Sequence, residues 1–190
     1  LIDVVGVAPS APITAVKVLR CDGSGYWSGI IKGIDWVTAN ARKPAIANMS
    51  LGGPPNQAVD DAIRRSASGG VFYALAAGNE SINACTRSPA RAGAGTNNGI
   101  VTVGATDSSD KQASFSNYGS CVDLWAPGVS ILSTTLKGGT TTLSGTSMAS
   151  PHVAGGGALY LSRNATAPPA TVESALKSAA TTSRLNVGSF

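Results

Sequence analysis

Short apolar runs alternate with amphipathic stretches along most of the chain. The apolar runs have the length of strands and carry few polar residues, which is typical of strands buried on both faces of a sheet. They cover residues 13–19, 45–49, 71–76, 100–104 and 122–126. Strands buried in this way belong to parallel sheets, so these runs predict a largely parallel sheet in the interior.

The stretches between these runs repeat apolar residues at helical spacing. One helix is expected after Ser28, which would cap it, with an apolar stripe at Ile30, Ile34, Val37 and Ala41. A second helix is expected to begin at Asn56 and to end at Gly69-Gly70. A closing helix should begin at Pro168-Pro169, because proline suits the first helical turn.

This succession of strands and helices predicts an α/β fold. Strands joined through helices lie parallel, and their helices cover both faces of the sheet. We therefore expect a three-layer sandwich with a mostly parallel central sheet. The 190 residues are enough for one domain with a substantial core, and no internal repeat or second domain is evident.

Composition narrows the class of protein and its partners. With 13% charged residues, 43% hydrophobic residues and 23 glycines, the chain resembles a compact, loop-rich globule and not a disordered segment. No apolar stretch approaches the roughly 20 residues of a membrane helix, so no membrane contact is expected. The net charge is +4, but the Lys and Arg residues are scattered without basic runs. Nucleic acid is therefore not expected as a partner.

One run carries most of the chemical information: Gly145-Thr146-Ser147-Met148-Ala149-Ser150-Pro151-His152-Val153-Ala154-Gly155. It predicts a serine nucleophile at the start of a helix, with Pro151 in the first turn. The positive end of that helix would favour negative charge that develops beside Ser147. Glycines 155–157 form helices poorly, so a helix that keeps them is expected to press closely against a neighbouring element.

This run resembles the serine motif of the subtilisin-like serine proteases, and especially their proteinase K and aqualysin branch. Three more segments agree in order and rough spacing: Asn48-Met49-Ser50-Leu51-Gly52-Gly53, Ala76-Ala77-Gly78-Asn79 and Ser114-Phe115-Ser116-Asn117-Tyr118-Gly119-Ser120. The resemblance implies a secreted, extracellular serine endopeptidase that needs no cofactor for catalysis. Ser147 would be the nucleophile, and the Asn79 side chain and the Ser147 N–H would bind the oxyanion.

The resemblance also implies that part of the site is missing. In the family the triad Asp and His precede the segment that Gly6-Val7-Ala8-Pro9 matches, so residues 1–190 would be an incomplete catalytic domain without its N-terminal part. Asp3 is not expected to be the triad Asp. His152 is the only histidine, and it lies five residues beyond Ser147 on the same predicted helix. It would therefore lie on another face of that helix, which favours a structural role.

By the same resemblance, an extended peptide or protein substrate would bind by strand addition between two edges, Ser24-Gly25-Tyr26 and Ser50-Leu51-Gly52. Ala76-Ala77-Gly78 would wall the first specificity pocket. Small walls admit many side chains, so broad specificity is expected. The enzyme is expected to be a monomer that an inhibitory propeptide accompanies.

Cysteines and one acidic residue complete the implied features. In the relatives the cysteines that match Cys85 and Cys121 pair with each other, and the partner of Cys21 lies in the absent segment; three reduced thiols in a cytosolic protein are the alternative. Asp123 matches a carboxylate that binds a structural Ca²⁺ ion, together with carbonyl groups at Asn98 and Ile100. Residues 91–99 are longer here than in those relatives, which would displace the carbonyls.

Two other classes of function remain open from the sequence. A non-catalytic peptide-binding or pseudoprotease fragment would keep the same motifs without a complete triad. An esterase with an α/β-hydrolase fold is disfavoured, because the G-x-S-x-G nucleophile elbow is absent.

Overall fold

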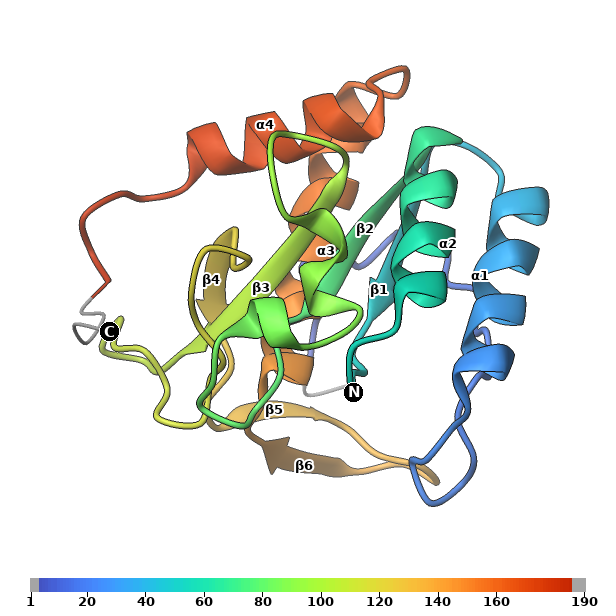
Figure 1. Cartoon of the computed structure of the whole chain (residues 1–190). Coiled ribbons are helices and arrows are strands. Elements are labelled where there is room, and N and C mark those ends of the chain that lie inside the picture. Colours follow the sequence, from blue (N-terminus) through green and yellow to red (C-terminus); the bar gives the residue numbers. More distant parts are fainter. Residues whose placement is uncertain (1–3, 186–190) are drawn as a thin grey trace.

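The computed structural model describes residues 4–185, and Asp3 lies outside the described residues. Four parallel strands form one sheet in the order β1-β2-β3-β4, which confirms the predicted parallel sheet (Figure 1). The strands are β1 (Ala45–Met49), β2 (Val71–Ala76), β3 (Ile100–Thr106) and β4 (Leu124–Pro127). Because the strands are parallel, their carboxyl ends meet at one edge of the sheet and their amino ends at the other.

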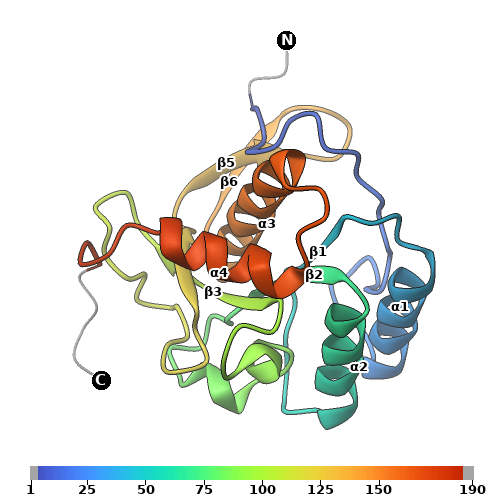
Figure 2. The same ribbon diagram turned by 90° about the horizontal axis from the view of Figure 1, so that it is seen from above.

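Helices cover both faces of this sheet, as predicted for a three-layer sandwich (Figure 2). One side carries α1 (Trp27–Asn40) and α2 (Gln57–Ser68), and the other carries α3 (Thr146–Arg163) and α4 (Pro169–Ala179). Strand β2 is buried on both of its faces, which explains why its sequence is a continuous apolar run. Val71, Tyr73 and Leu75 pack in the core of the first side, and Phe72 and Ala74 pack in the core of the second.

The signals at the ends of α2 are confirmed. The Asn56 side chain accepts a hydrogen bond from the N–H of Val59 and so caps the helix, and Gly69 is the residue at its end. Gly70 follows with φ +104°, a conformation that favours glycine. Two short 3₁₀ helices, η1 (Ala84–Thr86) and η2 (Ala90–Gly93), lie between β2 and β3.

Three local predictions are wrong. Residues 13–19 form no strand, although Val16 and Val18 approach α1 so closely that a Cβ on Gly33 would meet them. The first helix begins at Trp27 after Tyr26 and has no side-chain cap, so Ser28 lies inside it. Pro151 is the sixth residue of α3, in the second turn and not the first. A proline there removes only one hydrogen bond close to the helix start, which the helix tolerates.

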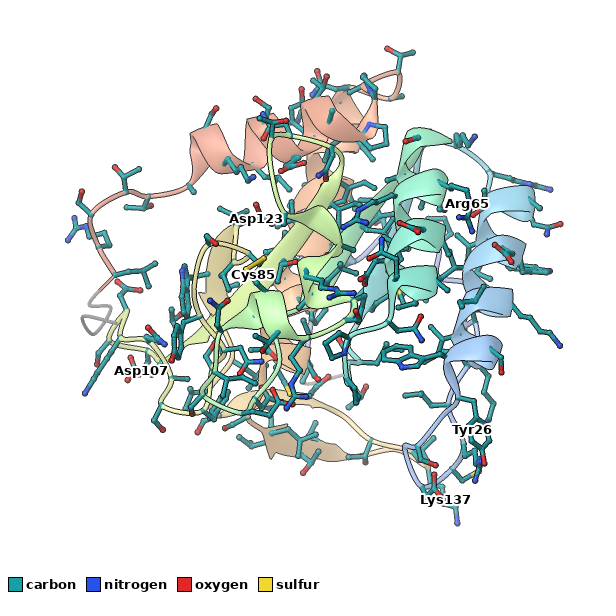
Figure 3. All side chains as sticks on the ribbon, viewed as in Figure 1. Tyr26, Arg65, Cys85, Asp107, Asp123 and Lys137 are labelled. Carbon is teal, nitrogen blue, oxygen red and sulfur yellow. A yellow bond between two sulfur atoms is a disulfide. The ribbon has the colours of Figure 1, made fainter. Side chains whose placement is uncertain are left out.

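The structure adds an antiparallel pair, β5 (Ile131–Thr134) with β6 (Thr140–Leu143), that the apolar pattern did not predict. Its residues are mostly exposed, so they lack the apolar signal of a buried strand. The predicted disulfide between Cys85 and Cys121 is present (Figure 3). Cys21 is exposed and unbridged. None of the helices in residues 4–185 is long and apolar enough to cross a membrane.

Candidate active site

Ser147 lies in the first turn of α3, beside the segment that follows β1. Its side chain is half-buried, and its hydroxyl makes a long contact of 3.4 Å with the carbonyl oxygen of Ser50. In return the Ser50 hydroxyl donates to the carbonyl oxygen of Ser147 at 2.8 Å. The Ser50–Gly52 segment is thus fixed directly against the predicted nucleophile, while the Ser147 hydroxyl itself is only weakly held.

The glycines of α3 allow the helix to press against its neighbours, as the sequence predicts. A Cβ added to Gly155 would lie 2.6 Å from the Cβ of Val7. One added to Gly157 would lie 3.1 Å from Ile46 and 3.3 Å from Phe72. The close approach at Gly157 anchors the helix on β1 and β2, and its first turn then falls near their carboxyl ends.

Asn79 follows β2 and is exposed, and Thr146 fixes the orientation of its amide group. The Asn79 Oδ1 atom accepts hydrogen bonds from the Thr146 N–H at 2.8 Å and from the Thr146 hydroxyl at 2.9 Å. The Thr146 hydroxyl also accepts from the N–H of Gly78 at 3.0 Å. Since its oxygen is used in this way, the Asn79 Nδ2 group faces the turn before Ser147, 3.5 Å from the position of a Cβ on Gly145. Among the described residues, none accepts a hydrogen bond from Nδ2.

Asn117 holds the loop that carries Asn79, a role that sequence reasoning missed. Its side chain is fully buried and donates to the Ala77 carbonyl at 2.9 Å and to Glu80 at 2.7 Å. Its Oδ1 accepts from the N–H groups of Glu80 and Ile82. Gly78 has φ +103°, and a Cβ there would lie 2.3 Å from Asn117. The 114–120 motif drew attention to the segment that contains Asn117, but it did not indicate that Asn117 binds the loop that carries Asn79.

His152 does not approach Ser147 as a base would. Its Nδ1 atom lies 2.8 Å from the Met148 carbonyl oxygen, one helical turn back along α3. Because it is the only histidine of the sequence, the chain carries no imidazole that could take the Ser147 proton. The only imidazole of these 190 residues is therefore turned away from the Ser147 hydroxyl and bound within its own helix.

A groove brings the two predicted substrate edges together. Its cavity of ≈ 370 Å³ is lined by Gly23, Ser24 and Gly25 on one side and by residues 50–54 on the other. Leu19, Trp27 and Ile30 add apolar surface to it. Tyr26 does not line the cavity; its side chain is 69% exposed, and the Arg20 guanidinium lies 4.6 Å from the centre of its ring (Figure 3). Ala76 and Ala77 are buried where β2 ends, with Gly78 half-buried after them.

The predicted calcium carboxylate lies at the other end of the sheet, at the start of β4. Asp123 accepts a hydrogen bond from the Lys177 ammonium at 2.7 Å. Burial lowers the pKa of Lys177, but its hydrogen bonds to Asp123 and Glu173 outweigh burial and raise the pKa above its usual value. Burial also raises the pKa of Asp123 and so opposes the pair. We treat Asp123 as charged, because both of its oxygens accept hydrogen bonds, one of them from an ammonium group.

Comparison with known proteins shows the family to which the chain is related. A model of the Subtilase family matches residues 2–189. Alkaline serine exoprotease A of Vibrio alginolyticus is 51% identical over 180 residues, which make up 95% of this chain and 33% of that protein. The extracellular serine proteinase of Thermus sp. (strain Rt41A) is 52% identical over 173 residues, 90% of this chain and 41% of that protein. The chain thus spans only 33% and 41% of the length of these relatives.

A solved structure agrees with the fold throughout. The crystal structure of a cold adapted subtilisin-like serine proteinase matches with a TM-score of 0.91 and 50% identity. The match covers 95% of this chain and 64% of that one. The predicted three-layer architecture is therefore the architecture of these proteinases.

Proposed function

This chain belongs to the subtilase family, and we propose that it carries the nucleophile and the oxyanion donor of a secreted serine endopeptidase. The observation that carries the proposal is the orientation of Asn79. Thr146 occupies the oxygen of its amide with two donors, so the amide N–H groups are turned toward the turn that holds Ser147. Such a donor is useful for acyl transfer, where charge builds on a carbonyl oxygen beside the nucleophile.

In the proposed reaction the Ser147 Oγ attacks the carbonyl carbon of a peptide bond. A histidine from outside these 190 residues takes the hydroxyl proton, and a carboxylate holds that histidine. The Asn79 amide and the Ser147 N–H donate to the oxyanion, and the positive end of α3 adds to their effect. The histidine then protonates the leaving amine, and water hydrolyses the acyl group from Ser147 by the same steps in reverse.

The proposed substrate is an extended stretch of peptide or protein between the Ser24–Tyr26 and Ser50–Gly52 edges. The groove between these edges and its apolar lining support this placement. Backbone edges supply hydrogen bonds that do not depend on the substrate sequence, and Ala76-Ala77-Gly78 would wall a first pocket with small residues. Broad specificity follows, because each methylene in an apolar pocket contributes only about 1–3 kcal/mol to discrimination.

Secretion, an inhibitory propeptide and a monomeric state belong to the same proposal. The Cys85–Cys121 disulfide supports an oxidising compartment, and the name of the Thermus relative describes an extracellular proteinase. The calcium ion expected at Asp123 is a separate matter, because Asp123 precedes β4 at the amino ends of the strands, at the opposite edge of the sheet from Ser147.

The test is labelling and kinetics of the full-length protein. A fluorophosphonate should modify Ser147, as mass spectrometry of the digest would show, and Ser147→Ala should lower turnover of a peptide substrate by roughly 10⁶-fold. The matched control is Ser162→Ala, at an exposed position near the other end of α3, which should change neither result. A protein that binds peptides without labelling or turnover would instead be the non-catalytic binding module, which the absence of a base in this chain keeps as the second candidate.

A further inference from the structure

The amino ends of β3 and β4 hold a buried ionic cluster that takes no part in the proposed reaction. It consists of Asp123, Glu173 and Lys177, and the two latter residues lie one turn apart on α4 (Figure 3 labels Asp123, beneath that helix). Lys177 donates to Asp123 at 2.7 Å and to Glu173 at 2.5 Å. The Glu173 side chain is fully buried, and that of Asp123 is 11% exposed. One ammonium group, on a side chain that is 28% exposed, therefore stands between two carboxylates that are buried or nearly so.

The remaining carboxylate oxygens are also occupied, each by backbone N–H groups. The second oxygen of Asp123 accepts from Thr102 at 2.8 Å. The second oxygen of Glu173 accepts from Asn98 at 2.7 Å and from Gly99 at 2.8 Å. The segment before β3 thus turns N–H groups, and not carbonyl oxygens, toward a carboxylate. Every carboxylate oxygen of the cluster has a donor, which is what a buried ion pair requires.

Two carbonyl groups at the start of β3 lie against other segments of the chain. The carbonyl oxygen of Ile100 faces Gly93, where an added Cβ would lie only 2.6 Å away from it. The neighbouring Gly99 carbonyl accepts a hydrogen bond from Tyr73 at 2.9 Å. Calcium needs roughly six to eight oxygen ligands, and no group of three or more acidic, histidine or cysteine residues in positions 4–185 could hold a metal ion.

The ammonium group excludes a cation from the same place. A calcium ion would bind an Asp123 oxygen at about 2.3–2.6 Å. The Lys177 Nζ atom already lies 2.7 Å from that carboxylate, so the two positive charges would be in near contact. As these groups lie, they do not fit a calcium ion. We propose that Lys177 takes the place of a metal ion at Asp123, so that this end of the sheet is held by an internal ammonium group and not by calcium.

The proposal predicts that no calcium ion binds at Asp123. Asp123→Asn removes the carboxylate charge that a calcium ion would need there. Calorimetric titration of the full-length protein with CaCl₂ should therefore give the same number of bound calcium ions per chain in Asp123→Asn as in the wild type. The matched control is Asp35→Asn, at an exposed position of α1, which should also keep the wild-type stoichiometry. Loss of one bound calcium per chain in Asp123→Asn alone would overturn the proposal.

A second measurement on the wild-type protein does not depend on the folding of a variant. Reductive methylation followed by mass spectrometry should find Lys177 protected to the same extent in CaCl₂ and in EDTA, while Lys32 reacts freely in both. If calcium made Lys177 as reactive as Lys32, the ion would have displaced the ammonium group from Asp123. That result would overturn the proposal.

Discussion

The two ends of the parallel sheet carry polar groups in opposite states. At the carboxyl ends of β1 and β2, Ser147 makes only a 3.4 Å contact through its hydroxyl, and no described residue accepts from the Asn79 Nδ2 group. At the amino ends of β3 and β4, each carboxylate oxygen of Asp123 and Glu173 has a donor within 2.8 Å. The first end has hydrogen-bond donors that no other described residue uses. At the second end no carboxylate oxygen is free to bind a ligand.

The difference separates positions that bind from positions that stabilise. A polar group with spare hydrogen-bonding capacity at the surface can exchange water for a substrate at little cost. When one member of a buried polar cluster is substituted, the protein loses stability, because the partner that remains is buried without a hydrogen bond or an opposite charge. Substitutions at the carboxyl end should therefore lower turnover with little effect on stability, and substitutions at the amino end should do the reverse.

Of the three substitutions that compare the two ends of the sheet, the largest effect on free energy is expected at the amino end, from Glu173→Ala. The substitution leaves the Lys177 ammonium with one carboxylate and the Asn98 and Gly99 N–H groups with no acceptor. Breaking a buried ion pair typically costs about 3–5 kcal/mol of unfolding free energy. Denaturant unfolding should show this loss, while kcat of the folded enzyme stays at the wild-type value.

The control for this variant is Asp35→Ala, which removes an exposed carboxylate from α1 and should change the unfolding free energy by less than about 0.5 kcal/mol. A Glu173→Ala protein with wild-type stability would mean that the cluster contributes little. A fall in kcat without unfolding would mean that the two ends of the sheet are coupled, and the comparison between them would fail.

The next largest effect is expected at the carboxyl end, from Asn79→Leu. Loss of one oxyanion donor lowers kcat by about 10²–10³-fold, a magnitude taken from another member of this family. KM should change little, because the amide contacts charge that is present mainly in the transition state. Steady-state kinetics and a thermal melt of the same preparation would separate this loss from unfolding.

Asn97→Leu makes the same exchange at an exposed position of the loop before β3 and should leave kcat unchanged. Unchanged turnover in Asn79→Leu, or a loss that its melting temperature explains in full, would contradict the oxyanion role. The second outcome would also place Asn79 among the positions that stabilise the fold.

Much of the fold could be predicted because its signals are local. Strands β1 and β2 and the cap at Asn56 follow from apolar runs and from a hydrogen bond within a few residues. The prediction of a strand at residues 13–19 was wrong because a strand needs a neighbouring strand to pair with, and an apolar run does not identify that partner. In the described structure β1 is an outer strand of its sheet, and residues 13–19 are paired with no strand.

In the candidate site too, residues within local motifs could be predicted and residues that depend on distant contacts could not. Ser147, Asn79 and the substrate edges could be proposed from motifs, since their residue types stand together in the chain. The bonds of Asn117 to residues 77–82 span 35 to 40 positions and left no local sign. Glu173 and Lys177 were missed for another reason: an i,i+4 pair of opposite charges normally indicates an exposed helix face, and only the packing of α4 buries it.

The smallest effect is expected from Thr146→Val, which tests whether the free amide of Asn79 depends on its orientation. Valine has nearly the shape of threonine and keeps the N–H that donates to the Asn79 oxygen at 2.8 Å, so only the hydroxyl is lost. That hydroxyl supplies the second donor to Asn79 and the acceptor for the Gly78 N–H. A hydrogen bond of this kind contributes about 0.5–1.5 kcal/mol, so kcat should fall about 2- to 10-fold, well short of the loss in Asn79→Leu. Thr171→Val, at an exposed position of α4, serves as the control. If Thr146→Val kept wild-type kcat, the N–H alone would be sufficient to orient the amide; if it lost as much as Asn79→Leu, the hydroxyl would be the dominant restraint on the oxyanion donor.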